Sequence, residues 1–600
     1  MKLDTPTPAP AAVDTAQLPL DALMQQAEAL KASGFREDAC QLYKTWIERS
    51  QSPTRFIALF NWGVMLSDSG KLTEAESAYR QALATNPGFL QAKINLGLVL
   101  ERQRKPEEAL EQWAQAAQLP PAGPAADVSL QTMALNHIGR LQEARSEYQA
   151  AEEALAQSLA MQPRQPDALQ HWVHLRQKQC KWPVCTPLPG ISVNDMLAAT
   201  SPLAMLSLHD DPALQWMASR AFLERKFKLT EERLAPPKRI AHQRIRIGYL
   251  SGDLCTHAVG LLMADLIEAH DRNRFEIFAF DFSPEDGTAY RARLKQAFDH
   301  VIDIRQWDDR RTASVIQQLE IDVLIDLHGL SSGARPGIMA LRPAHLQGTY
   351  LGFIGTTAMP WIDFVVADRF ALPEDLTPYF SETPLYIDGA FIPLHASEAT
   401  SPRITRASVG LPEDAVVLVS FNNLYKFNPT IFQAWLRVLK RCEQAVLWLL
   451  DDNPWATENL KRHIQQHGIS LSRVIFSRRC THQEYRERLH LADLYLDTYP
   501  YNAGSTARDV MDAHLPMVTL SGRTSVSRMA GSMLTAAGLT ELVTDNLEQY
   551  EATISTLAQQ PRQLQRLKQA LTDGAPQWAD APSRLILSLE SELLRRLDAL

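Results

Sequence analysis

The sequence lacks the features that mark several large classes of protein. Its six cysteines are scattered, with no CxxC pair and no cysteine–histidine cluster at zinc-ligand spacing, which argues against a disulfide framework and a structural zinc site. No apolar run approaches the roughly 20 residues that a membrane helix needs, and the N-terminus has no apolar segment of a signal peptide. A net charge of -9 gives no basic surface for nucleic acid. We therefore expect a cytoplasmic protein with no membrane span and no nucleic-acid partner.

The length of the chain indicates several domains. Six hundred residues exceed what one hydrophobic core usually serves. The composition, 45% hydrophobic and 22% charged, is ordinary for globular domains, so the chain can bury several cores. From the patterns described below we expect a Pro/Ala-rich disordered leader over residues 1–19, tetratricopeptide repeats over residues 20–182 and a helical linker over residues 183–243. Two α/β lobes follow over residues 244–397 and 398–600, the second with C-terminal helices.

A repeat of about 34 residues opens the folded part of the chain. The segment FNWGVMLSDSGKLTEAESAYRQALATNP aligns with INLGLVLERQRKPEEALEQWAQAAQLPP, so that Gly63 falls on Gly97 and Tyr79 on Trp113. Small residues where two helices must approach closely, with Pro after the second helix, are typical of tetratricopeptide repeats. Stacked copies predict an α-helical solenoid whose concave groove is suited to a peptide or a partner protein, and an unrelated helical bundle is the alternative.

From Arg244 onward, apolar runs of strand length alternate with amphipathic helical segments. The first series contains RIGYL, FEIFAFDF and DVLIDLHG, and the second contains AVVLVSFN, AVLWLLD and LYLDT. A Pro-rich passage around residues 392–412 separates the two series and is expected to be a hinge. This alternation predicts two doubly wound α/β lobes with a ligand crevice at the carboxyl ends of their strands, where the lobes face one another.

The turn YNAGSTARDV predicts an anion site in the second lobe. It leaves a strand and enters a helix through Asn502, Gly504, Ser505 and Thr506. A glycine lets the backbone come close to a ligand, while hydroxyl groups and the unpaired N–H groups of a helix start favour a diphosphate. Asp509, one turn into the helix, would then reach a ribose hydroxyl. An ordinary helix cap with a solvated carboxylate is the alternative for this pattern.

Other segments bring single side chains to the same crevice. Lys426 precedes the Asn-Pro helix start of FNNLYKFNP, where its ammonium can neutralise a leaving diphosphate. His257 follows the first strand of the first lobe, where an imidazole can act as a base or orient a ligand. A surface lysine and a structural histidine are the alternatives. A glycine-rich segment at the same rim indicates close backbone approach to a ligand and includes Gly355 and Thr356.

The sequence lacks the paired carboxylates that would hold a magnesium ion on a diphosphate. The sequence contains no DxD motif, and the pair Asp451 and Asp452 begins DDNPWATENL in the context of a helix start. We therefore expect no metal and no other cofactor. The positive charge for a leaving diphosphate must then come from Lys426 and from the helix start at Ser505.

Five long motifs follow one another along the chain: HAVGLL, GARPGIMALRPAHLQGTYLGFIGTT, FNNLYKFNP, LADLYLDTYPYNAGSTARDV and PMVTLSGRTSVSRMAGS. Together with the repeats they resemble the O-GlcNAc transferase family, including its SPINDLY branch and its bacterial relatives, from Arg244 to about Leu557. The resemblance implies a GT-B glycosyltransferase fold. It also implies an inverting, metal-independent transfer of GlcNAc from UDP-GlcNAc to Ser or Thr of proteins.

The resemblance further implies roles for individual residues. His257 matches the family's active-site histidine, and Lys426 matches the lysine that contacts the diphosphate. Tyr425 and Asn423 lie beside the donor in this reading, with Tyr425 counted among the catalytic residues. The remaining donor-binding matches are the phosphate-binding hydroxyl groups of Ser505 and Thr506 and the ribose-binding acid Asp509.

Departures from the family pattern leave the donor and the acceptor open. The uracil is expected near residues 480–485, where His482 and Tyr485 replace a lysine and a histidine of the animal enzymes, and Gly504 replaces a histidine. Plant SPINDLY members use GDP-fucose, and some bacterial relatives transfer glucose from UDP-glucose to asparagine. A protein fucosyl- or glucosyltransferase, a GT-B epimerase, a small-molecule glycosyltransferase and a repeat scaffold with an inactive GT-B domain are the alternatives.

Overall fold

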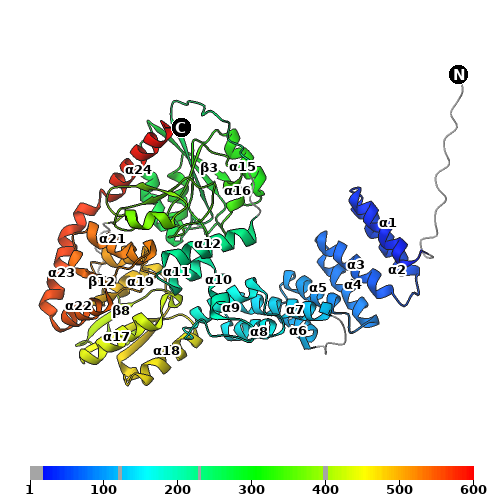
Figure 1. The fold of residues 1–600 in the computed structure, drawn as a ribbon, viewed down its shortest axis with the longest axis horizontal. Coiled ribbons are helices and arrows are strands. Elements are labelled where there is room, and N and C mark those ends of the chain that lie inside the picture. Colours follow the sequence, from blue (N-terminus) through cyan, green and yellow to red (C-terminus); the bar gives the residue numbers. More distant parts are fainter. Residues whose placement is uncertain (1–17, 119–124, 228–231, 396–402, 600) are drawn as a thin grey trace. The chain divides into compact units, whose positions relative to one another are not determined.

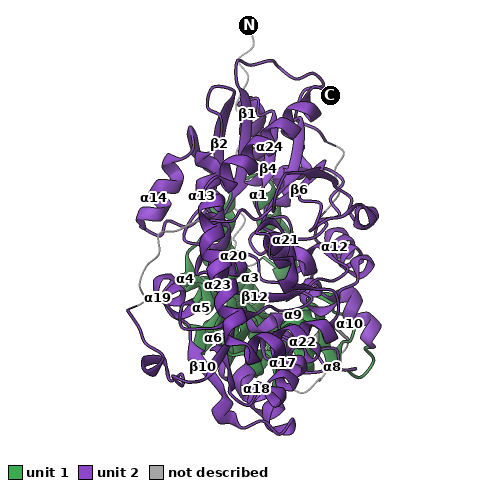
Figure 2. Ribbon diagram, turned by 90° about the vertical axis from the view of Figure 1, so that its left-hand side faces the viewer, with its two compact units in different colours: residues 1–175, 188–191 green, residues 176–187, 192–600 purple. Residues whose placement is uncertain are grey.

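A computed structural model describes residues 18–118, 125–227, 232–395 and 403–599. The chain divides into two compact units, one made of residues 1–175 and 188–191 and the other of the remaining residues (Figure 2). Most of the predicted leader and the predicted lobe boundary at residue 397 lie outside the described residues. Among the described residues, no helix is both long enough and apolar enough to cross a membrane.

The first unit is built from successive helices that pack in pairs, blue to cyan in Figure 1. The repeated residues explain the pairing, because a Cβ atom on Gly63 would lie 2.6 Å from the ring of Tyr79 and one on Gly97 would lie 2.2 Å from Trp113. These two repeats therefore need a glycine where an aromatic ring of the second helix crosses. The helices are α1 (Leu20–Ala32), α2 (Arg36–Arg49), α3 (Arg55–Asp68), α4 (Leu72–Thr85), α5 (Leu90–Arg102), α6 (Pro106–Gln118), α7 (Ala125–Ala144), α8 (Tyr148–Met161) and α9 (Pro166–Lys178), the last of which ends in the second unit.

Three short helices of the second unit precede its first strand. Asp210, between the second and third of them, accepts hydrogen bonds from the hydroxyl groups of Tyr499, Thr524 and Ser527, at 2.9, 2.7 and 2.7 Å. These bonds attach the linker helices to the C-terminal part of the chain. The helices are α10 (Val193–Ala199), α11 (Pro202–Leu208) and α12 (Pro212–Lys226).

The first α/β lobe contains a parallel sheet that has seven strands within the described residues, in the order β3-β2-β1-β4-β5-β6-β7. Its strands are rich in buried Ile, Leu, Val and Phe, as expected for a sheet covered on both faces. The strands are β1 (Ile245–Ser251), β2 (Phe275–Asp281), β3 (His300–Asp303), β4 (Val323–Asp326), β5 (Leu346–Thr349), β6 (Phe364–Ala367) and β7 (Thr383–Tyr386). The helices are α13 (Ala258–Glu268), α14 (Ala289–Gln296), α15 (Asp309–Gln318) and α16 (Pro336–Ala340).

The second lobe repeats this plan with six parallel strands among the described residues, in the order β10-β9-β8-β11-β12-β13. The strands are β8 (Val416–Ser420), β9 (Ala445–Asp451), β10 (Val474–Arg478), β11 (Leu494–Leu496), β12 (Met517–Leu520) and β13 (Val543–Thr544). The helices are α17 (Pro429–Arg441), α18 (Pro454–Gln466), α19 (His482–Leu489), α20 (Ser505–Asp512), α21 (Met529–Ala536), α22 (Leu547–Gln559), α23 (Pro561–Gly574) and α24 (Ala581–Leu597).

The last helix, α24, packs against α13 and β7 of the first lobe (Figure 1). Its Glu590 carboxylate lies 2.7 Å from Nδ1 of His270, and Nε2 of the same ring lies 2.8 Å from the hydroxyl of Tyr249. All three side chains are buried. The C-terminal end of the chain therefore belongs structurally to the first lobe.

Both sheets change direction at corresponding places. The order runs outward on either side of the β1/β4 pair in the first lobe and of the β8/β11 pair in the second. In doubly wound sheets a ligand binds at this switch point, beyond the carboxyl ends of the strands. The predicted site segments follow β1, β8 and β11, so the topology brings them to the two switch points.

Candidate active site

A cavity of about 540 Å³ lies between the two α/β lobes, at both switch points. It is lined from the first lobe by the loops after β1, β4 and β5 and from the second by the loops after β8, β10 and β11. Nine of the thirteen predicted site residues line it: His257, Asn423, Tyr425, Lys426, His482, Tyr485, Gly504, Ser505 and Thr506.

Helix α20 presents its N-terminus to the cavity. Gly504 is the N-cap residue, and no side chain caps the helix there. Ser505 and Thr506, the first two helical residues, both line the cavity. The first N–H groups of a helix have no intrahelical partner and carry the positive end of the helix dipole. The absence of a side-chain cap favours the anion-binding interpretation of this turn over the ordinary helix cap.

Lys426 ends the short 3-10 turn that follows β8, and its side chain is only 7% exposed. Its Nζ donates a hydrogen bond of 2.9 Å to the backbone carbonyl of Asn502 and lies 4.0 Å from the centre of the Tyr501 ring. Burial lowers the pKa of the Lys426 ammonium, and the buried carboxylate of Asp497 acts in the opposite direction. The ammonium is thus held next to the turn that begins α20.

The edge of the cavity near α19 carries the side chains expected around the base. The rings of His482 and Tyr485 lie with their centres 6.0 Å apart, and both line the cavity. Nε2 of His482 lies 3.6 Å from Oδ2 of Asp509, and Asp509 itself is not among the residues that line the cavity. On the opposite side, Oδ1 of Asn423 accepts a hydrogen bond of 2.6 Å from Arg479.

His257 is the main ionisable group that the first lobe brings to the cavity. It is the N-cap residue of α13, and its side chain is half exposed. Its Nδ1 lies 3.4 Å from the backbone nitrogen of Val259 and 3.4 Å from Oδ2 of Asp253. The same Asp253 oxygen lies 3.5 Å from Nε2 of His328, which accepts a hydrogen bond from the amide of Gly252. Two histidines and one carboxylate therefore meet at this rim.

The structure does not bring Gly355 and Thr356 to the cavity. The Thr356 hydroxyl donates a hydrogen bond of 2.7 Å to Oε2 of Glu382, and both side chains are buried. A buried carboxylate needs such donors, which accounts for the position of this threonine. The side chain of Asn502 is also turned away, because its Nδ2 donates to the carbonyl of Thr498 at 2.8 Å. Only the backbone carbonyl of Asn502 meets Lys426.

Several lining residues gave no signal in the sequence. The apolar wall of the cavity belongs to this set, and Leu203 of α11 shows that the linker helices contribute to the site. Asp253, which lies behind the lining beside His257, was not predicted either. An aliphatic residue in a helical segment is indistinguishable from a core residue until the tertiary contacts are known. The apolar wall consists of Leu203, Val259, Leu262, Leu351, Ile354, Ile392 and Met529.

Comparison with known proteins identifies the lobes. Residues 222–399 and 395–574 match the family model described as glycosyl transferase family 41, and residues 60–127 match a tetratricopeptide repeat. The chain belongs to glycosyl transferase family 41. These matches confirm the family resemblance and the tetratricopeptide prediction.

Curated relatives of the chain are named as peptide N-acetylglucosaminyltransferases. The chain is 32% identical over 336 residues to a probable UDP-N-acetylglucosamine–peptide N-acetylglucosaminyltransferase SEC of Arabidopsis thaliana, over 55% of this chain and 34% of the relative. It is 26% identical over 421 residues to a UDP-N-acetylglucosamine–peptide N-acetylglucosaminyltransferase of Caenorhabditis elegans, over 51% of this chain and 37% of the relative. The family 41 chain thus spans little more than a third of the length of these relatives.

A solved structure has the same architecture. An O-GlcNAc transferase mutant of Thermobaculum terrenum matches with a TM-score of 0.64 at 23% identity, covering 90% of this chain and 97% of the other. The match confirms the predicted fold, a helical repeat region followed by two α/β lobes of the GT-B type.

Proposed function

We propose that this family 41 member is a protein glycosyltransferase that moves GlcNAc from UDP-GlcNAc to Ser or Thr side chains. The observation that carries the proposal is the family match across both lobes. Between them the lobes enclose a cavity lined by a lysine, a helix N-terminus without a side-chain cap and a histidine. The names of the relatives support the donor and the type of acceptor.

The proposed donor lies mainly against the second lobe. Its diphosphate faces the N-terminus of α20 and the ammonium of Lys426, which together supply positive charge. Its ribose is held by Asp509, and its base lies along the edge formed by His482 and Tyr485. Tyr425 lines the cavity beside Tyr501, with the ring centres 6.2 Å apart.

The proposed reaction is a single displacement that inverts the anomeric carbon. The acceptor oxygen forms the new bond to that carbon while the bond to the diphosphate oxygen breaks, and UDP leaves with the electron pair. His257, on the opposite lobe, is placed to accept the proton of the hydroxyl group. Because Lys426 and the helix end stabilise the leaving diphosphate, we propose that no metal is required.

The proposed acceptor is a protein held by the groove of the tetratricopeptide unit. Helical repeats of this kind form extended concave surfaces, and the matched repeat lies within residues 60–127. No other cofactor enters the scheme, and the sugar nucleotide is a co-substrate.

The test uses the full-length chain with UDP-GlcNAc, UDP-glucose and GDP-fucose, each with a protein extract as acceptor and with EDTA present. We expect hexosamine on Ser or Thr in tandem mass spectra, obtained with UDP-GlcNAc and undiminished by EDTA. Modification only with UDP-glucose or GDP-fucose would replace the proposed donor. Absence of transfer from all three donors would contradict the proposed function.

A further inference from the structure

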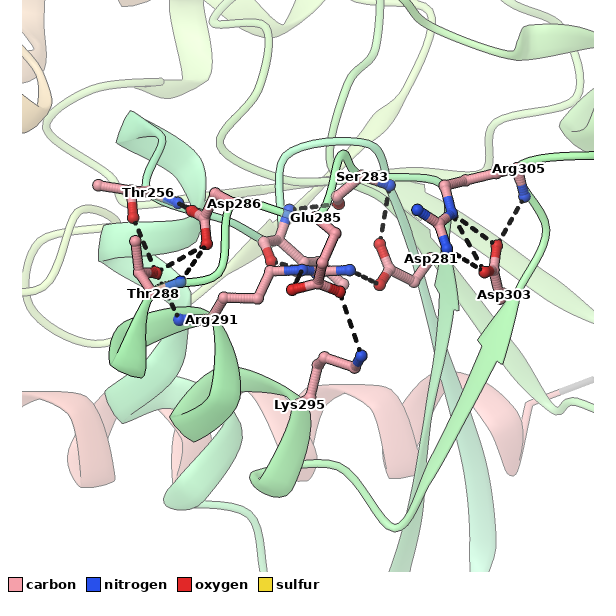
Figure 3. A network of polar contacts seen from close by, with 11 residues as sticks. Thr256, Asp281, Ser283, Glu285, Asp286, Thr288, Arg291, Lys295, Asp303 and Arg305 are labelled. Atoms are coloured by element: carbon pink, nitrogen blue, oxygen red, sulfur yellow. Dashed lines mark hydrogen bonds and ion pairs between the residues drawn. The ribbon is translucent and has the colours of Figure 1, made fainter.

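The loop that carries His257 is held from outside by a neighbouring segment of the first lobe. This loop, residues 252–257, joins β1 to α13 and is called the histidine loop below. Across from it lies the segment between β2 and α14, residues 282–288. Figure 3 shows the polar contacts between the two segments.

The carboxylate of Asp286 divides its two oxygens between the two segments. Oδ1 accepts hydrogen bonds from the backbone nitrogen and the hydroxyl of Thr288, at 3.0 and 2.8 Å, and so closes its own turn. Oδ2 reaches across and accepts a hydrogen bond of 2.8 Å from the backbone nitrogen of Thr256 (Figure 3). Thr256 is the residue immediately before His257. The carboxylate of Asp286 therefore bridges the two segments and contacts the backbone one residue before His257.

The same segment and helix α14 contact the histidine loop at a second point. The hydroxyl of Ser283 accepts a hydrogen bond of 2.8 Å from the backbone nitrogen of Leu254, and the guanidinium of Arg291 donates to the carbonyl of Leu254. Arg291 also pairs with Asp281 at 2.7 Å, and both of these charged side chains are buried (Figure 3). Because this part of the network is buried, its loss would disturb the lobe as a whole.

Helix α13 closes the other side of the histidine loop. A Cβ atom on Gly260 would lie 2.2 Å from the carbonyl oxygen of Cys255 and 2.7 Å from that of Asp253. The loop thus packs against the backbone of the helix with no room for a side chain. It lies between α13 and residues 282–288. Besides the polar contacts described above, it is held by a contact of 3.2 Å between the hydroxyl groups of Thr256 and Thr288 and by the bond from Gly252 to His328.

The bridge requires a carboxylate. Hydrogen bonds hold the pKa of Asp286 well below its usual range, the largest effect coming from the Thr256 amide, followed by those of the Thr288 amide and hydroxyl. Both oxygens of the ionised group act as acceptors. An asparagine side chain has one acceptor oxygen and an NH₂ donor, so it can satisfy one side of the bridge while its NH₂ group faces a donor on the other.

We propose that Asp286 is a positioning residue for the transfer reaction: its Oδ2 fixes the backbone next to His257 and so sets where the imidazole lies in the cavity. The inference rests on the proposed function. Asp286 is exposed at the surface and does not line the cavity, so its effect reaches the reaction through the histidine loop. A displacement of about 1 Å in such a group can lower a rate about 100-fold.

The test compares Asp286→Asn with wild type in the full-length protein. We expect kcat for protein modification to fall about 10- to 100-fold, with an unchanged dissociation constant for UDP. Hydrogen–deuterium exchange should rise in the peptide that covers residues 252–257 and not across the whole chain. The matched control is Glu285→Gln, because Glu285 contacts only Arg291 and Lys295 among the residues of Figure 3, both at 3.4 Å. This variant should keep wild-type kcat.

A double-mutant cycle separates this inference from the function on which it rests. If Asp286 acts through His257, the change Asp286→Asn should lower activity little further in a His257→Ala background. Wild-type kcat for Asp286→Asn beside an impaired His257→Ala variant would overturn the inference alone, as would an equal loss in both backgrounds or raised exchange throughout the chain. A wild-type protein without transfer activity would overturn the proposed function itself.

Discussion

The two α/β lobes share one strand order and bring opposite chemistry to the cavity. In each lobe, side chains at the site follow the two strands at the switch point of the sheet, β1 and β4 in one lobe and β8 and β11 in the other. The first lobe presents the imidazole of His257, with the carboxylate of Asp253 and the buried ring of His328 next to it. The second presents the ammonium of Lys426 and the N-terminus of α20. The fold fixes where a site lies, and the loops decide what each half does.

Under the proposed function, this difference gives each lobe a separate task. Positive charge and N–H donors in the second lobe suit the diphosphate of the donor, while the proton acceptors of the first lobe suit the incoming hydroxyl. Changes in the first lobe should therefore lower turnover and leave donor affinity intact. Changes in the second lobe should lower the affinity for the donor or slow the departure of its diphosphate.

The largest effect is expected for His257→Ala. Loss of a general base typically costs about 100- to 10,000-fold in rate, so kcat should fall by that factor. The dissociation constant for UDP, measured by calorimetry, should stay within about twofold of wild type if the lobes divide their tasks as described. An equal loss of donor affinity would show that the first lobe also binds the nucleotide.

A somewhat smaller loss is expected for Lys426→Ala. Removing one preorganised donor from a developing negative charge costs about 100- to 1,000-fold in kcat. The melting temperature should fall as well, because the Lys426 ammonium donates a hydrogen bond to the buried carbonyl of Asn502 and faces the buried carboxylate of Asp497. The value of kcat is therefore measured well below the melting temperature of the variant.

Lys440→Ala is the matched control for Lys426→Ala, since Lys440 lies exposed near the end of α17. It should leave kcat unchanged. Wild-type donor turnover in Lys426→Ala would contradict the role given to the second lobe.

A moderate effect on binding is expected for Asp509→Ala. If its carboxylate accepts hydrogen bonds from the ribose, the dissociation constant for UDP should rise about tenfold, as for a charge-assisted hydrogen bond of about 1.5 kcal/mol. The substitution also removes the group that faces His482 at 3.6 Å. His482→Ala, measured in parallel, distinguishes a lost ribose contact from a displaced base-stacking ring. Unchanged affinity in Asp509→Ala would remove the ribose assignment.

The smallest effect on activity is expected for Thr356→Ala, which tests the position that the structure gives to this residue. The change leaves the buried Glu382 with one donor fewer, so the free energy of unfolding should fall by about 1–3 kcal/mol. Both kcat and the affinity for UDP should stay at wild-type values. A selective loss of donor affinity at unchanged stability would return Thr356 to the donor site.

Much of the fold could be predicted because its signals are periodic and local. The recurrence of Gly63 at Gly97 and the alternation of apolar strands with amphipathic helices are visible within short windows of sequence. The helix-start turn at Ser505 was equally local. By contrast, the association of α24 with the first lobe depends on His270 and Glu590, which lie 320 residues apart. No local pattern carries such a contact.

The parts of the site that could not be predicted depend on tertiary contacts. Asp286 and Thr256 lie 30 residues apart, and a carboxylate in a Gly-containing turn has no feature that identifies its partner. Thr356 was misleading for a similar reason. A hydroxyl beside glycines has the same local pattern whether it faces a ligand or a buried carboxylate 26 residues away, as Thr356 faces Glu382.

The division of tasks between the lobes is tested most directly by calorimetric titration of UDP into wild type, Lys426→Ala and His257→Ala in the presence of EDTA. We expect wild type and His257→Ala to bind UDP equally and Lys426→Ala to bind it about tenfold more weakly. Binding of UDP that is lost in His257→Ala and kept in Lys426→Ala, or no binding to the wild-type protein, would contradict it.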